Sequence, residues 1–208
     1  MLNTMRKHGV TLAIFAALTT GFTAIVHALT QGTIATQNAR QQQLLFDQII
    51  EPQYYDNLPR RRCYLVANPL LGPGTHRIYL TQKENKDNGV IMEATAPNGY
   101  SGAIQLLVGA NFTGTILGAR VTQHHETPGL GDKIELRLSQ WIAGFSGQHI
   151  TSEQDAHWAV KKDGGQFDQF TGATITPRAV VNAIKRAGLF AQTLPTQLSS
   201  LPTCGGAS

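Results

Sequence analysis

The sequence is organised around the stretch DQFTGATITPR, residues 168–178, which leads directly into the apolar helical segment AVVNAIKRA, residues 179–187. Thr176 is of a type preferred at a helix N-cap and Pro177 of a type preferred at the first helical position, so we expect a helix to begin here. The first amides of such a helix lack internal partners and lie at the positive end of its dipole. The stretch therefore predicts a binding site for an anion such as a phosphate beside Thr174. A plain N-cap, with no ligand, is the alternative explanation of the same residues.

The hexapeptide TGATIT, residues 171–176, with Asp168 upstream, resembles the flavinylation motif of FMN-binding domains. Members of that family carry FMN as a phosphoester on a threonine, and the resemblance implies Thr174 as the acceptor, with Thr176 as the alternative. A hydroxyl is a weak nucleophile without activation, so attachment is expected to need a separate flavin transferase. The other cofactor-binding residues that the motif implies are Thr171, Gly172, Ala173 and Thr176.

A second stretch, HHETPGLG at residues 124–131, resembles another signature of the same family. The resemblance implies that this loop forms the other side of the flavin site, and its glycines permit positive φ angles that let backbone approach a ring. The residues expected near the flavin are Glu126 and Thr127 for polar contacts, Gly129 for close approach and Leu130 for apolar contact. Lys161 is expected to screen the phosphate, unless Lys161 and Lys162 are simply a solvated pair.

The chain length, one N-terminal hydrophobic segment and the run from residue 100 to 133 are similar to G subunits of Rnf-type electron-transport complexes, called Rsx in some bacteria. The C subunits of sodium-pumping NADH:quinone reductases are more distantly similar. The resemblance implies a covalent-FMN electron carrier without turnover of its own. It would act with other membrane and iron–sulfur subunits, in a complex that couples electron transfer between NADH and ferredoxin-like partners to ion translocation; Rsx variants keep a redox-sensing transcription factor reduced. The alternative is an anchored, non-redox assembly or sensor domain that binds flavin or another phosphate ligand reversibly.

Residues 9–29 contain no Asp, Glu, Lys or Arg, and 21 residues suffice to cross a hydrocarbon core as a helix. Arg6 and Lys7 precede this segment, which predicts a cytoplasmic N-terminus and a periplasmic main domain anchored in the inner membrane. A cleaved signal peptide is the competing interpretation, but its hydrophobic region is normally shorter. We therefore expect a tip and transmembrane helix at residues 1–30, a juxtamembrane helix or linker at 31–52, and an FMN-binding domain at 53–208.

Composition argues against several other functions. Charged residues make up 14% of the chain, with a net charge of +4, and only Arg60–Arg62 forms a dense basic run, so we expect no nucleic-acid binding. The histidines lack a metal-ligand pattern, and no constellation typical of a hydrolase stands out.

If the domain is exported, Cys63 and Cys204 are expected to form a disulfide; otherwise they are two unpaired thiols.

We expect the domain to be of the mixed α+β class. Ile134, Leu138, Trp141, Ile142 and Phe145 are spaced as one stripe of an α-helix capped by Asp132, and we expect the stripe to belong to the core. The final helix is expected to end near Gly188, followed by a tail across the domain. The predicted strands cover residues 63–66, 76–80, 90–94, 104–110, 115–121 and 158–162, with a polar loop at 82–88 and a hairpin turn at 111–114.

Overall fold

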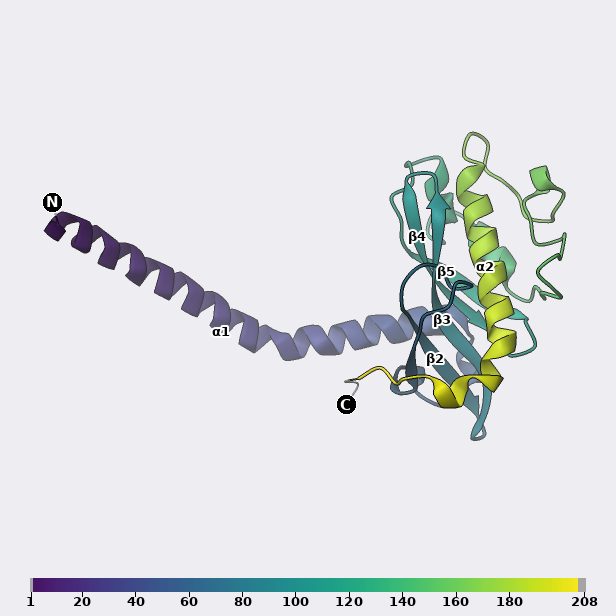
Figure 1. Ribbon diagram of the computed structural model, residues 1–208, viewed down its shortest axis with the longest axis horizontal. Coiled ribbons are helices and arrows are strands. Elements are labelled where there is room, and N and C mark those ends of the chain that lie inside the picture. The colour runs from purple at the N-terminus through teal and green to yellow at the C-terminus, as the bar shows by residue number, and fades with distance from the viewer. Residues whose placement is uncertain (1, 206–208) are drawn as a thin grey trace. The chain divides into compact units, whose positions relative to one another are not determined.

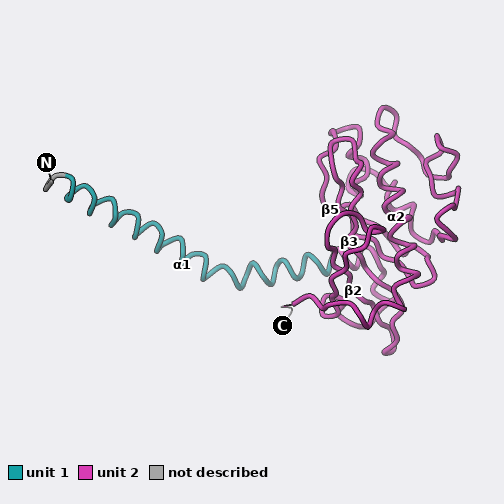
Figure 2. The backbone as a smooth tube through the Cα atoms, viewed as in Figure 1, with its two compact units in different colours: residues 1–44 teal, residues 45–208 magenta. Residues whose placement is uncertain are grey.

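The structure is a computed structural model that describes residues 2–205, with the backbone alone for residues 2–4. Met1 and residues 206–208, which fall in the predicted anchor and the predicted domain, lie outside the described residues. The chain forms two compact units, Met1–Leu44 and Leu45–Ser208 (Figure 2).

The first element is helix α1, Leu2–Ile49, which joins the predicted transmembrane and juxtamembrane segments into one helix (Figure 1). It ends just before Pro52, as expected from the steric conflict between proline and a preceding helix. Among the described residues, α1 is the one helix long and apolar enough to cross a membrane. The Thr19 and Thr23 hydroxyls donate to the carbonyls of Phe15 and Thr19, at 3.0 and 2.8 Å, so these polar groups are satisfied within the helix.

The second unit is built on an antiparallel sheet whose strands are neighbours in chain order, β1 to β5 (Figure 1). The five strands confirm the predicted strands between residues 63 and 121, but the predicted polar loop at 82–88 is wrong. Glu84 and Asn85 have φ angles of 53° and 61°, and two consecutive positive φ values make the tight turn that a two-residue hairpin requires. The strand bounds are Cys63–Val66 for β1, His76–Lys83 for β2, Lys86–Gly99 for β3, Gly102–Ala110 for β4 and Ile116–Gln123 for β5.

Helix α2, Ile175–Thr193, covers one face of the sheet and buries an apolar stripe against β3 and β4 (Figure 1). The prediction that this helix ends near Gly188 is wrong. A Cβ at Gly188 would lie 2.2 Å from Cδ1 of Ile150 and 3.0 Å from Cδ1 of Ile116. The glycine therefore serves close packing in the middle of the helix and does not mark its end.

The other face of the sheet is covered by the last residues of α1. Phe46, Ile49 and Ile50 are buried there, in a cluster with Tyr79, Ile91 and Leu107 of the sheet. Gly109 and Gly118 are register partners in β4 and β5, and a Cβ on either would lie 2.6 Å or less from an atom of Ile49. The end of α1 thus packs directly on backbone, and Phe46, Ile49 and Ile50 are part of the domain core.

The C-terminal tail is tied to β1. Cys63 and Cys204 form a disulfide, with 5.4 Å between their Cα atoms. The Cys204 amide donates to the Cys63 carbonyl at 2.9 Å, and the Leu65 amide donates to the Pro202 carbonyl at 2.8 Å. The tail therefore satisfies backbone groups along the free edge of β1, which would otherwise be an unpaired sheet edge.

Removing this disulfide is expected to destabilise the domain. The two cysteines are 141 positions apart, so the double variant Cys63→Ala/Cys204→Ala should lose up to about 5 kcal/mol of unfolding free energy through the larger entropy of its unfolded chain. Chemical denaturation of the detergent-solubilised chain measures this difference. Dithiothreitol should lower the stability of the wild type and leave the stability of the variant unchanged. Equal denaturation midpoints for the two proteins under oxidising conditions would contradict the prediction.

Two predicted elements between β5 and α2 are wrong. The stripe from Ile134 to Phe145 forms two short 3₁₀ helices, Gly131–Ile134 and Gln140–Phe145, because the Ser139 hydroxyl accepts from the Trp141 amide at 3.1 Å and starts a new turn. Asp132 consequently lies inside the first of these helices and does not cap an α-helix. In place of a strand at 158–162 there is one bridge, between Val160 and Phe167, followed by the 3₁₀ turn Lys161–Asp163.

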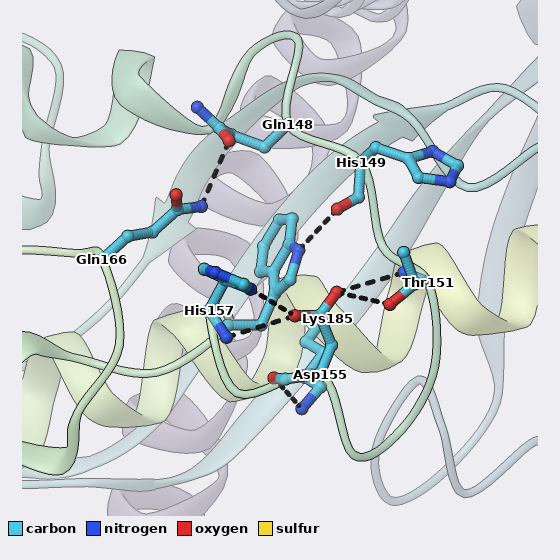
Figure 3. Close-up of polar contacts among 8 residues, drawn as sticks. Gln148, His149, Thr151, Asp155, His157, Gln166 and Lys185 are labelled. Atoms are coloured by element: carbon cyan, nitrogen blue, oxygen red, sulfur yellow. Dashed lines mark hydrogen bonds and ion pairs between the residues drawn. The ribbon is translucent and has the colours of Figure 1, made fainter.

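A polar network around Asp155 fixes the loop before Trp158 (Figure 3). Its carboxylate accepts from the Thr151 hydroxyl at 2.8 Å, from the Thr151 amide at 3.2 Å and from the His157 amide at 3.1 Å. The Asp155 carbonyl accepts from Nζ of Lys185 on α2 at 3.0 Å. These donors, the Thr151 hydroxyl foremost, lower the pKa of Asp155 to about 2 because they stabilise its charged form.

We expect Asp155→Asn to lower the free energy of unfolding by about 1 kcal/mol at neutral pH, because the amide cannot accept all three hydrogen bonds. Since the folded-state pKa of about 2 lies below the ordinary 3.8, the carboxylate's stabilisation is complete above that ordinary value and is lost as pH falls from 3.8 to 2. The stability difference between wild type and variant should therefore narrow across this window in denaturant titrations. The exposed Glu153, changed to Gln, is the matched control; a difference that stays constant down to pH 2 would argue against this role of Asp155.

Candidate functional site

The two sequence motifs meet at the beginning of α2, where they are joined by a buried carboxylate. Glu126, in the loop after β5, is only 4% exposed, and one of its oxygens accepts a short hydrogen bond from the hydroxyl of the fully buried Thr176. Its other oxygen accepts from the Ser101 amide, in the turn between β3 and β4, at 3.1 Å. One side chain thus connects the 124–131 loop, the start of α2 and the end of the β3–β4 hairpin.

Glycines surround this carboxylate because no side chain would fit. A Cβ at Gly99 would lie 2.8 Å from one Glu126 oxygen. A Cβ at Gly131 would lie 2.8 Å from the other and 2.9 Å from the Thr176 hydroxyl oxygen. The second signature therefore needs its last glycine for close packing on Glu126 and Thr176.

Thr174, and not Thr176, occupies the N-cap position of α2, so the predicted cap is wrong by two residues. The Thr174 carbonyl accepts from the Arg178 amide at 3.3 Å, as the N-cap carbonyl should. Its side chain makes no capping hydrogen bond, and no hydrogen bond among the described residues uses its hydroxyl. Thr174 is half-buried, whereas Thr176 is turned inward to Glu126. Because Pro177 has no N–H, the amides of residues 175 and 176 are the donors left free in the first turn.

The turn at residues 170–173 lies against the second loop. Gly172 has a φ of 80°, and a Cβ at this position would be 3.6 Å from a methyl group of Leu130. In the opposing loop Gly129 has a φ of 78°, and the Thr127 carbonyl accepts the Leu130 and Gly131 amides at 3.1 and 3.2 Å. Thr127 and Gly129 are exposed and Leu130 is 43% exposed, so these three predicted residues lie at the surface beside Gly172, whereas the predicted residues Glu126 and Thr176 are buried. Thr171 is exposed in the turn, and Ala173 closes it through its amide, which donates to the Phe170 carbonyl at 3.0 Å.

Aromatic side chains pack against the turn at residues 170–173 and the segment before it. The Trp141 indole donates to the Asp168 carbonyl at 2.8 Å, and its ring lies 5.2 Å from that of Phe170. Phe145 stacks on Phe167, with 4.4 Å between ring centroids. The rigid base under residues 167–170 thus comes from the predicted stripe, although the stripe is not an α-helix.

Two ion pairs flank the turn. Nζ of Lys161 lies 2.6 Å from the Asp168 carboxylate, and the Arg178 guanidinium donates two hydrogen bonds, of 2.6 and 2.8 Å, to Asp163. The hydrogen bond with Arg178 lowers the pKa of Asp163, and the same bond raises the pKa of Arg178. These residues are exposed or half-exposed, so both cations can exchange a carboxylate for another anion at small cost.

His124 fixes the beginning of the second loop. Its Nδ1 accepts from the Glu126 amide at 3.0 Å, and its Nε2 lies 2.7 Å from a Glu135 oxygen. The neutral tautomer with hydrogen on Nε2 satisfies both contacts. Arg137 also donates to Glu135, and the hydrogen bonds from Arg137 and His124 lower the pKa of Glu135. His124 therefore positions the Glu126 backbone.

Sequence reasoning missed the contributions of Gly99 and Ser101. The available signal was the tetrapeptide GYSG at 99–102, which marks a turn between two apolar runs. Nothing in that tetrapeptide indicates that the Ser101 amide faces a buried carboxylate from a loop 25 positions later.

Thr176→Val should destabilise the second unit by about 1–3 kcal/mol, because it leaves one oxygen of a buried carboxylate without its donor. A drop of several degrees in the Tm of the solubilised chain would report this loss. Thr176→Ser retains the hydroxyl and should keep most of the stability. Equal Tm values for the Val and Ser variants would contradict the proposed hydrogen bond.

Comparison with known proteins agrees with this arrangement. The model of the FMN-binding domain family matches residues 99–188, which contain both motif loops, and that of the RnfG N-terminal region matches residues 1–49. The G subunit of the ion-translocating oxidoreductase complex of Escherichia coli K12 is 65% identical over 99% of this chain and 100% of its own length. This chain belongs to the family of G subunits of ion-translocating oxidoreductase complexes.

Other members of the family are similarly close. The G subunit from Cronobacter sakazakii is 66% identical over 99% of each chain, and the one from Yersinia pestis is 61% identical over the same shares. Among solved structures, the crystal structure of Shewanella oneidensis NqrC aligns with a TM-score of 0.47 and 21% identity, covering 72% of this chain and 74% of its own. Family membership and the candidate span in α1 together indicate a single-pass membrane protein.

Proposed function

We propose that this chain is an electron carrier whose FMN is joined through its phosphate to the Thr174 hydroxyl. The observation that carries the proposal is the difference between two neighbouring threonines. The Thr174 hydroxyl is free of hydrogen bonds among the described residues and sits at the N-cap of α2, whereas the Thr176 hydroxyl is buried and bound to Glu126. Only the first can be esterified without disrupting the packing between the two loops.

The local electrostatics favour a phosphate at Thr174. The free amides at the start of α2 and the positive end of the helix dipole stabilise negative charge there. Lys161 and Arg178 stand on either side of the turn in exposed ion pairs and can each turn toward the phosphate. FMN would supply the one- and two-electron chemistry, while the protein supplies its position and electrostatic environment.

Glu126 has a different role from the one expected from sequence. Both of its oxygens already accept hydrogen bonds inside the protein, so we assign it the task of positioning the two loops. Thr127, Gly129 and Leu130, which are exposed beside the attachment turn, remain the residues of this loop that can reach a bound ring.

The relatives are named as G subunits of an ion-translocating oxidoreductase complex, which supports other subunits of such a complex as partners. We propose that these include membrane and iron–sulfur subunits, and that a flavin transferase acts in maturation. Within such a complex the chain would relay electrons between NADH- and ferredoxin-linked subunits, and in Rsx variants the complex would keep a redox-sensing transcription factor reduced. The basic residues Arg6 and Lys7 before the apolar segment favour a cytoplasmic N-terminus and a periplasmic second unit at the inner membrane.

Denaturing gels read for flavin fluorescence test the attachment, because a covalent flavin survives denaturation and a dissociable one does not. The chain co-expressed with a flavin transferase should fluoresce, and Thr174→Ala should lose the signal completely. Thr196→Ala is the matched control, since this exposed threonine lies outside both motifs and should be dispensable. Fluorescence retained in Thr174→Ala but lost in Thr176→Ala would move the attachment point. No fluorescence in the wild type would favour a non-redox module that binds its ligand reversibly.

A further inference from the structure

A groove crosses the end of β3, between the loop at 67–74 on one side and α2 on the other. It consists of two adjoining pockets, of about 600 and 210 Å³, which share Pro97 and Arg186 as walls, and we call it the Arg186 groove. Among the described residues that line it, none is an aspartate or a glutamate. Its polar side chains are those of Asn68, Asn98, Arg178, Asn182 and Arg186.

Arg186 is a half-buried cation without a counter-charge. Its Nε is buried and has no hydrogen-bond partner, and no hydrogen bond or ion pair among the described residues involves the rest of its guanidinium. Burial lowers the pKa of Arg186, and no carboxylate offsets that effect. A partly desolvated guanidinium is costly unless an acceptor pairs with it, and its planar fork matches the two oxygens of a carboxylate. The groove therefore presents a guanidinium that an external carboxylate can satisfy.

The loop side of the groove is preformed. Leu71 is fully buried, and its carbonyl accepts from the Thr95 amide of β3 at 2.7 Å. Gly72 has a φ of 109°, and a Cβ there would lie 2.5 Å from the Thr95 carbonyl oxygen. The rings of Pro69 and Pro73 fix two further φ angles in this wall. Because this wall is already ordered, a partner that binds it does not have to order the loop.

The α2 side of the groove is one stripe of the helix. Arg178, Asn182 and Arg186 follow one another at intervals of four, so they lie along the same face. Arg178 is paired with Asp163, so of the two cations in the groove only Arg186 is unpaired among the described residues. Asn182 and Asn98 are exposed on opposite sides, and neither side-chain amide makes a hydrogen bond among the described residues. Such amides can hydrogen-bond the backbone of a bound segment.

The dimensions of the groove suit a peptide segment. At 1.5 Å of rise per residue, its α2 side from Ile175 to Arg186 is about 16 Å long, which is the length of about five extended residues. The groove continues past Arg186 to the loop at 67–74, so a bound segment can extend on both sides of the cation. Arginine is also among the residues that are enriched in the energetically dominant part of protein interfaces.

We propose that the Arg186 groove is a docking site for an acidic segment of another subunit of the complex, with an aspartate or glutamate carboxylate accepting from the Arg186 guanidinium. This inference rests on the proposed assembly with other subunits and does not require the flavin. Ile175, which is 46% exposed, lines the groove one residue after Thr174. The docked subunit would therefore lie next to the proposed attachment point.

Zero-length cross-linking of the complex, purified through the full-length chain, tests the proposal. A carbodiimide joins a lysine amine to a carboxylate in contact with it, so Arg186→Lys should form an amide bond to an aspartate or glutamate of another subunit. Mass spectrometry identifies both joined residues. Arg60→Lys, at an exposed position outside the groove, is the matched control, and it should give at least about tenfold less product because an ion-pair contact is required.

Failure of the docking site and failure of the assembly give different results. If other subunits copurify but position 186 forms no cross-link to them, forms one only to a second copy of this chain, or reacts no better than position 60, the docking proposal is overturned. If no other subunit copurifies with the wild type, the proposed assembly itself is refuted.

Arg186→Gln separates docking from a structural role. Because the Arg186 guanidinium makes no ion pair within the chain, this variant should change the Tm of the isolated, solubilised chain by no more than about 2 °C. A fall of several degrees would assign Arg186 a structural role and overturn the proposal. A Tm that rises in inorganic phosphate for the wild type but not for Arg186→Gln, without the cross-link, would indicate a small free anion as the occupant and would also overturn it.

Discussion

The hydrogen bond between Glu126 and Thr176 is the constraint on which the site depends. It joins segments 50 positions apart in the chain and lies in a space where two glycines leave no room for anything larger. Because a buried carboxylate is costly without donors, the loop after β5 and the first turn of α2 must meet in this register. The half-buried Thr174 and the exposed Leu130 are thereby brought close to each other.

The rest of the second unit holds those two segments in place. The antiparallel sheet carries α2 on one face and the end of α1 on the other, and aromatic rings from the segment between β5 and α2 support the attachment turn. The flexible polar groups, Lys161 and Arg178 among them, remain at the surface in ion pairs that solvent can replace. The packed aromatic rings and the exchangeable ion pairs together suit the modification that we propose for Thr174.

Local sequence features predicted most of the fold. Apolar runs bounded by turn residues indicated all five strands of the sheet and a sixth, at 158–162, that does not form, and the two loops that carry the motifs do lie close together. Two errors arose where distant contacts decide local structure, and a third where a local hydrogen bond does. Gly188 is typical of a helix end, but in the structure it packs against Ile150. Thr176 is typical of an N-cap, but its hydroxyl donates to the buried Glu126. Ser139 breaks an apparently continuous helical stripe by capping Trp141 through its own hydroxyl. The partly buried Arg186, whose Nε has no hydrogen-bond partner among the described residues, could not be identified from sequence, because an arginine on a helix is normally solvated.

The buried side chains of Phe46, Ile49 and Ile50 determine where the chain can be truncated or cleaved without exposing one face of the sheet. A fragment starting at residue 53 would lack these three side chains, so Tyr79, Ile91 and Leu107 would be exposed to water. An exposed apolar sheet face of this kind favours self-association. A proteolytic cut ahead of Leu45 would instead release a second unit with both of its layers complete. The membrane helix thus doubles as a structural layer of the domain that it anchors.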